Sequence, residues 1–154
     1  MKATALAACA GLVVALLVAT EATAGSPTRA SWAAAANRYC TVGNAQIRAL
    51  PKVTTGARLI GDIRATLVIA KRETRQLARI LRPPRERSLI GKLIANSRKQ
   101  NTIFQEQLLP ALISGDSSRV QYLLSELKPL GIRYNQIARR LGARICAQNP
   151  SPSG

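Results

Sequence analysis

Residues 57–82 carry an unbroken heptad pattern, which constrains the fold more than any other feature of the sequence. Apolar or small residues recur at alternate steps of three and four, at Ile60, Ile63, Leu67, Ala70, Thr74, Leu77 and Leu81. Residues at this spacing share one face of an α-helix and form a seam for packing. Because Pro83 and Pro84 cannot continue a helix, the segment ends before them. We predict a helix here that supplies the organising core.

Three further amphipathic segments predict helices over about residues 28–49, 84–113 and 117–147. Their joints are short, so consecutive helices are expected to be antiparallel neighbours. The sequence therefore predicts an all-α domain over residues 25–148, a kinked antiparallel four-helix bundle with up-down-up-down topology. Residues 149–154 contain two prolines, two serines and a glycine, and are expected to form a disordered tail.

Proline and glycine residues mark where the helices are expected to bend or stop. Pro110 should kink or fray the end of the third helix, and Pro129 should bend the fourth near residues 125–131. Between these helices, Gly115 is expected to act as a C-terminal stop and Asp116 as an N-cap.

The first 24 residues have the pattern of an export signal. Lys2 is followed by an apolar run over residues 3–19 and a small-x-small sequence at residues 22–24. We predict a signal peptide over residues 1–24 and a secreted or envelope-located mature protein. Two alternatives are an uncleaved N-terminal helix that anchors the protein and a lipoprotein modified at Cys9, whose preceding apolar stretch is short.

Two cysteines, Cys40 and Cys146, remain in the mature chain, and in an exported protein they predict one disulfide. The alternatives are two free thiols or an intermolecular bridge. In straight helices, Cys146 would lie about 45 Å beyond the last turn and Cys40 about 15 Å before the first turn. The pairing therefore requires departures from straight helices, which we expect to be a stagger and kinks.

Several short segments support a resemblance to a known group. They are Asn-Ala-Gln-Ile at residues 44–47 after Cys40, Leu-Arg-Pro-Pro at 81–84, the turn at 114–116, and Ala-Arg-Arg-Leu-Gly at 138–142 before Cys146. The chain resembles a loose group of short exported proteins of high-GC Gram-positive bacteria, which pair an early and a C-terminal cysteine around a helical bundle. The resemblance implies a helical, exported, disulfide-bonded domain and transfers no catalytic residue.

The chain is strongly basic, with 23 lysines and arginines against 7 acidic residues, a net charge of +16. Such a charge favours anionic partners. We predict an anion-binding patch made of Arg75, Arg79, Arg82, Arg85, Arg87, Arg139, Arg140 and Arg144. Its expected partner is an anionic lipid or polymer of the cell envelope, and a protein partner stays open. Export, and the absence of aromatic residues among these arginines, argue against nucleic acid. The alternative is a solvated face in an arginine-rich proteome.

The sequence offers little for catalysis. It has no histidine, no phosphate-binding glycine loop and no GxSxG serine motif. The mature carboxylates are scattered, and Glu73 stands beside Lys71, Arg72 and Arg75, which indicates local charge compensation. We therefore predict a protein that is not an enzyme and uses no cofactor or metal.

One polar interruption stands out in the apolar stripes. Ser97 and Asn101 interrupt the apolar stripe of the third predicted helix, and Tyr134 lies on the stripe of the fourth. These residues form a candidate pocket, unless they only satisfy one another as a polar layer. The favoured function is electrostatic association with the envelope through the basic patch. The alternative is a small-ligand carrier or sensor that uses the polar layer.

Overall fold

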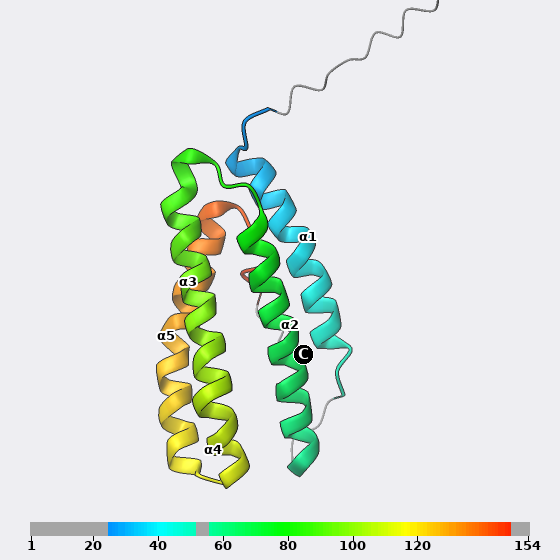
Figure 1. Ribbon diagram of the computed structural model, residues 1–154, viewed down its shortest axis with the longest axis vertical. Coiled ribbons are helices and arrows are strands. Elements are labelled where there is room, and N and C mark those ends of the chain that lie inside the picture. The colour runs from blue at the N-terminus through cyan, green and yellow to red at the C-terminus, as the bar shows by residue number, and fades with distance from the viewer. Residues whose placement is uncertain (1–24, 52–55, 149–154) are drawn as a thin grey trace, which may run out of the picture.

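Figure 1 shows the computed structural model, which describes residues 25–51 and 56–148. The secondary structure of these residues is entirely helical, which confirms the predicted class. The long helices are α1 (Arg29–Arg48), α2 (Gly56–Arg79), α3 (Arg87–Ile103) and α5 (Ser117–Leu141). The 3₁₀ turn η1 (Pro84–Glu86) precedes α3, and the π-helical turn η2 (Phe104–Leu108) and α4 (Leu109–Ser114) follow it. The predicted signal peptide and tail lie outside the described residues.

The long helices lie side by side, and their ends gather at two ends of the molecule (Figure 1). α1 begins, α2 ends, α3 begins and α5 ends near the top of the view, whereas α4 joins α3 to α5 at the bottom. α1 packs against α2, α2 against α3, and α3 against α5. Residues distant in sequence therefore meet at the upper end.

Two helix starts are fixed by side-chain caps. Thr28 accepts a hydrogen bond from the Ser31 backbone N–H at 3.1 Å, and the Ser31 hydroxyl accepts one from the Thr28 N–H at 3.0 Å. This reciprocal pair satisfies two amides that the helix leaves free. Asp116 caps α5 by accepting from the Arg119 N–H at 2.9 Å, and Gly115 ends α4 with a φ of 71°. The predicted turn between these helices is confirmed.

The predicted third helix is divided rather than continuous over residues 84–113. At η2 the Leu109 N–H donates to the Phe104 carbonyl, five residues back instead of four. Pro110 follows directly and has no N–H to continue the α-helical ladder. The extra residue in the turn accommodates the proline, after which α4 resumes.

α5 contains Pro129 and continues past it. The helix ends at Leu141, six residues earlier than predicted. Gly142 adopts a φ of 82°, and the Ala143 N–H donates to the Ala138 carbonyl at 2.9 Å. This left-handed glycine cap turns the chain out of the helix. The following residues bring Cys146 beside Cys40, with Cα atoms 5.1 Å apart in a disulfide. The predicted pairing is confirmed, and the turn at Gly142 brings the cysteines together.

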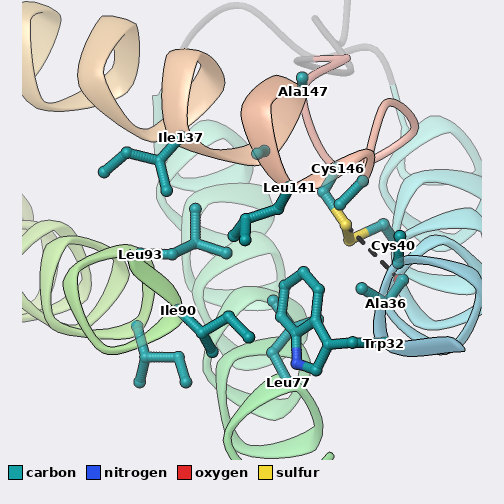
Figure 2. Close-up of a cluster of buried hydrophobic side chains, with 14 residues drawn as sticks. Trp32, Ala36, Cys40, Leu77, Ile90, Leu93, Ile137, Leu141, Cys146 and Ala147 are labelled. Atoms are coloured by element: carbon teal, nitrogen blue, oxygen red, sulfur yellow. Dashed lines mark hydrogen bonds between the residues drawn. A yellow bond between two sulfur atoms is a disulfide. The ribbon is translucent and has the colours of Figure 1, made fainter. Parts of the chain in front are cut away.

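The buried side chains form two separate clusters. The upper one surrounds the disulfide, and Figure 2 shows Trp32, Leu77, Ile90, Leu93 and Leu141 converging beside it. The lower one joins α3, η2, α4 and α5 through Ile103, Leu108, Ala111, Leu123 and Leu127. No buried residue of α2 belongs to the lower cluster. The amino-terminal half of α2 therefore contributes to neither core.

The predicted seam of α2 is consequently only partly a core. Thr74 and Leu77 are buried, whereas Ile60, Ile63, Leu67 and Ala70 are half-buried. Leu81 is 77 % exposed, because α2 ends at Arg79 and the chain leaves the helix before the prolines. The prediction that the whole seam organises the core is wrong for Leu81 and incomplete for the first half of the helix.

Candidate functional site

A cavity of about 430 Å³ lies where the seam of α2 is left half-buried. Its walls come from α1, α2, α3, η2, α5 and the segment after α5. The apolar lining residues are Ile47, Ile63, Leu67, Ala70 and Phe104. The polar lining residues are Asn44, Thr66, Glu73, Ser97, Gln100, Asn101, Tyr134 and Gln148. Cavities of this size and mixed character are typical of small-molecule sites.

The cavity has an apolar end and a polar end. The Thr74 hydroxyl lies 2.7 Å from the Ser97 hydroxyl, whereas Lys71, which precedes Thr74 on α2, donates to Gln105 in η2, which follows α3. Later residues of α2 therefore lie beside earlier residues of α3, and earlier residues of α2 lie beside η2. Ile63 and Leu67 lie on the side of Phe104, and Glu73 lies on the side of Ser97.

Among the lining residues that the structure describes, Glu73 is the single carboxylate. Burial raises its pKa from 4.5 to about 7. Its carboxyl group lies against α1 at Gly43, where an added Cβ would overlap Oε2. The pKa of Tyr134 is also raised, first by burial and then by the charge of Glu73. The two groups are thus electrostatic neighbours in a poorly solvated space.

The cations next to Glu73 in sequence do not compensate it. Lys71 donates to the side chain of Gln105, and Arg72 donates to that of Gln46. Arg75 is exposed to solvent. The interpretation of Glu73 as a surface acid with local charge compensation is therefore wrong. Sequence reasoning missed this residue, although its position three residues after Ala70 places it at the edge of the seam.

The structure brings the three candidate pocket residues, Ser97, Asn101 and Tyr134, into the lining of this one cavity. Ser97 and Asn101 also share Thr74, whose hydroxyl accepts from Asn101 Nδ2 at 3.1 Å. The two alternatives from the sequence are therefore both present. A polar network exists, and it faces a cavity.

The eight arginines of the predicted patch belong to the chain segments that meet at the upper end of the molecule (Figure 1). Seven are exposed and Arg82 is half-buried. We call this set the basic end. Arg139 and Arg144 also border a second hollow, of about 450 Å³, with Ala147 and Gln148. Arg79, Arg139 and Arg140 occupy last turns of helices, where a cation stabilises the negative end of the helix dipole.

Within residues 25–51 and 56–148, no three Cys, His, Asp or Glu side chains gather as a metal site requires. No helix in this part of the chain combines the length and hydrophobicity needed to cross a membrane.

No protein-family model, no curated protein and no solved structure matches the chain.

Proposed function

We propose that this protein is a non-catalytic binding domain, an antiparallel up-down-up-down bundle that holds a small molecule in the cavity beside α2. The observation that carries the proposal is the unfilled seam. Ile63, Leu67 and Ala70 follow a core pattern, yet they line a cavity instead of packing against buried residues. An apolar wall without partner atoms loses dispersion energy, which a bound apolar group would restore.

A fluorescent apolar probe tests this function. N-phenyl-1-naphthylamine should bind the exported, oxidised protein at one site per chain and raise its melting temperature, because a ligand that binds only the folded state stabilises it. Ala70→Leu places three more carbon atoms in the cavity and should weaken binding at least tenfold. Ala95→Leu makes the same change at an exposed position of α3 and serves as the matched control. Unchanged probe binding in Ala70→Leu would exclude the cavity.

The basic end supports a second candidate function, electrostatic association of an exported protein with the cell envelope. The segments that carry its exposed arginines, in α2, η1, α3, α5 and the final segment, gather at one end of the molecule (Figure 1), and Glu86 is the acidic residue of η1. Clustered cations attract anionic surfaces, and screening by salt weakens that attraction. A role in helix capping and solubility is the competing explanation for the same residues.

Vesicle sedimentation separates these explanations. The wild type should bind vesicles rich in anionic lipid at low salt and dissociate at moderate salt. Replacing Arg75, Arg79 and Arg140 with serine should reduce binding more than replacing Arg58, Arg64 and Arg98, which removes the same charge elsewhere. Equal losses in the two triple variants would show that only net charge matters, and equal binding to neutral vesicles would exclude the envelope function.

A further inference from the structure

We propose that the ligand of the cavity is an amphiphile with an apolar body and one ammonium group, and that Glu73 binds the ammonium. This inference rests on the ligand-binding function proposed above and names the class of molecule. It is carried by the charges of the lining and by the order of its apolar and polar residues.

The charges of the lining are unusual for this chain. The protein has a net charge of +16, yet among residues 25–51 and 56–148 no lysine, arginine or histidine lines the cavity, and Glu73 is the one carboxylate in its lining. An anionic head group would find no cation there and would lie near Glu73. A cationic head group would find a counter-charge in a poorly solvated site, where such a pair interacts strongly.

The neighbouring polar groups fit an ammonium that needs several acceptors. Ser97 and Asn101 from α3 and Tyr134 from α5 line the same cavity as Glu73. Their oxygens can accept hydrogen bonds, and an ammonium has only donors to offer. On α1, Gly43 provides the space that the Glu73 carboxyl occupies.

The apolar end of the cavity indicates that the ligand has an apolar chain and shows in which direction that chain would extend. Ile63, Leu67 and Phe104 line that end, and Ile47 lies on α1. A chain extending from an ammonium at Glu73 would run along α2 between these side chains. Affinity should rise about fourfold with each methylene buried, until the cavity is filled.

The ionisation of Glu73 makes the expected affinity for an ammonium ligand depend on pH. Because the pKa of the carboxyl is raised to about 7, the ionised form is the minor one below pH 7 and the major one above it. Tyr134 on α5 has a raised pKa and stays neutral, and α3 and α1 contribute only uncharged lining residues. Lys71 and Arg72 on α2 are engaged by glutamines.

The test compares three ligands of equal chain length by titration calorimetry of the oxidised protein at pH 8. Octylamine should bind at least tenfold more tightly than octanol, and octanoate should bind most weakly. The affinity for octylamine should fall as the pH is lowered through 7. At pH 6.5 its binding should release protons, which titrations in buffers of different ionisation enthalpy measure.

Two variants assign the preference to one residue. Glu73→Gln should remove the advantage of octylamine and the proton release while keeping the affinity for octanol, which also shows that the fold is intact. Glu106→Gln loses the same charge at an exposed position and should behave as the wild type. Equal binding of amine and alcohol, or a preference for octanoate, overturns the ligand class but leaves a ligand-binding cavity. Failure of all three ligands and of the fluorescent probe overturns both proposals.

Discussion

At the scale of single residues, the burial of Glu73 lowers the stability of the folded protein. Its folded-state pKa of about 7 is above the ordinary value of 4.5, so the folded protein binds more protons than the unfolded chain between these two values. Stability therefore falls as the pH rises from 4.5 to 7 and stays lower above 7. A glutamine would avoid that cost, which makes an acid at this position a candidate functional group.

Glu73→Gln should stabilise the protein, and the gain should depend on pH. We expect almost no gain at pH 4 and a gain of up to about 3 kcal/mol at pH 8, since one pKa unit corresponds to about 1.4 kcal/mol. Urea denaturation followed by the fluorescence of the single tryptophan, the buried Trp32, measures it. The exposed Glu106→Gln is the control, and a gain independent of pH would contradict this account.

The sequence could indicate part of this site but not its acid. Ser97 and Asn101 were identifiable because they interrupt an apolar stripe, and Tyr134 because it is a polar-tipped member of another. Glu73 stands among cations, and that pattern is typical of a solvated surface. Its burial depends on Gly43, a small residue on another helix that leaves space for the carboxyl group. Such a relation between two helices is set by tertiary packing.

At the scale of elements, the glycine that ends α5 has a backbone conformation that other residues rarely adopt, whereas a glycine inside α2 does not need one. Gly142 has a φ of 82°, which an L-residue adopts only with strain, and an added Cβ would lie 3.4 Å from Ala33 Cβ. Gly61 lies inside α2 with open space around the position of a Cβ. The same substitution should therefore have opposite effects at the two positions.

Gly142→Ala should destabilise the protein by about 1 to 2 kcal/mol, from backbone strain and the close contact. Gly61→Ala should stabilise it by about 0.5 to 1 kcal/mol, because alanine has the higher helix propensity. Thermal unfolding monitored by circular dichroism compares the two variants with the wild type. Destabilisation by both would show that α2 has packing at Gly61 that the structure does not show.

Helix ends were predictable where the stop signal and the end of the apolar stripe coincide. The turn at Gly115 and Asp116 is one such place. At Gly142 the stripe continues to Ile145 on the predicted helix, so periodicity outweighed the glycine. Pro110 predicted an irregularity in the helix. It did not predict the extra residue in the turn of η2, because a proline is compatible with both a frayed turn and a π-helical turn.

At the scale of the whole molecule, the disulfide and a few long-range hydrogen bonds hold the final segment on α1. Asn44 Nδ2 donates to the Ile145 carbonyl at 3.2 Å, and the Ile145 N–H donates to Asn37 Oδ1 at 3.0 Å. Asn44 and Cys146 also line the cavity. The bond between Cys40 and Cys146 therefore supports the upper core and one wall of the cavity together.

Replacing both Cys40 and Cys146 with serine should lower the free energy of unfolding by about 2 to 5 kcal/mol, since the loop they close spans 106 residues. Binding of the fluorescent probe should weaken as well, because the cavity wall on the final segment loses its covalent support. Urea titrations of the variant and of the wild type with and without reductant provide the comparison. Identical midpoints in all samples would show that the bond adds nothing to stability.

The position of the disulfide also decides how the molecule would respond to a mechanical load. Tension applied between residues 25 and 148 passes along the first part of α1, across the sulfur atoms, and out through the final segment. The 106-residue separation between the cysteines, roughly 350 Å of extended chain, bears none of that tension. Stretching single oxidised molecules should release little length, and adding a reductant should release the remainder. A domain built this way would keep the cavity walls between its two cysteines free of load while its ends are pulled.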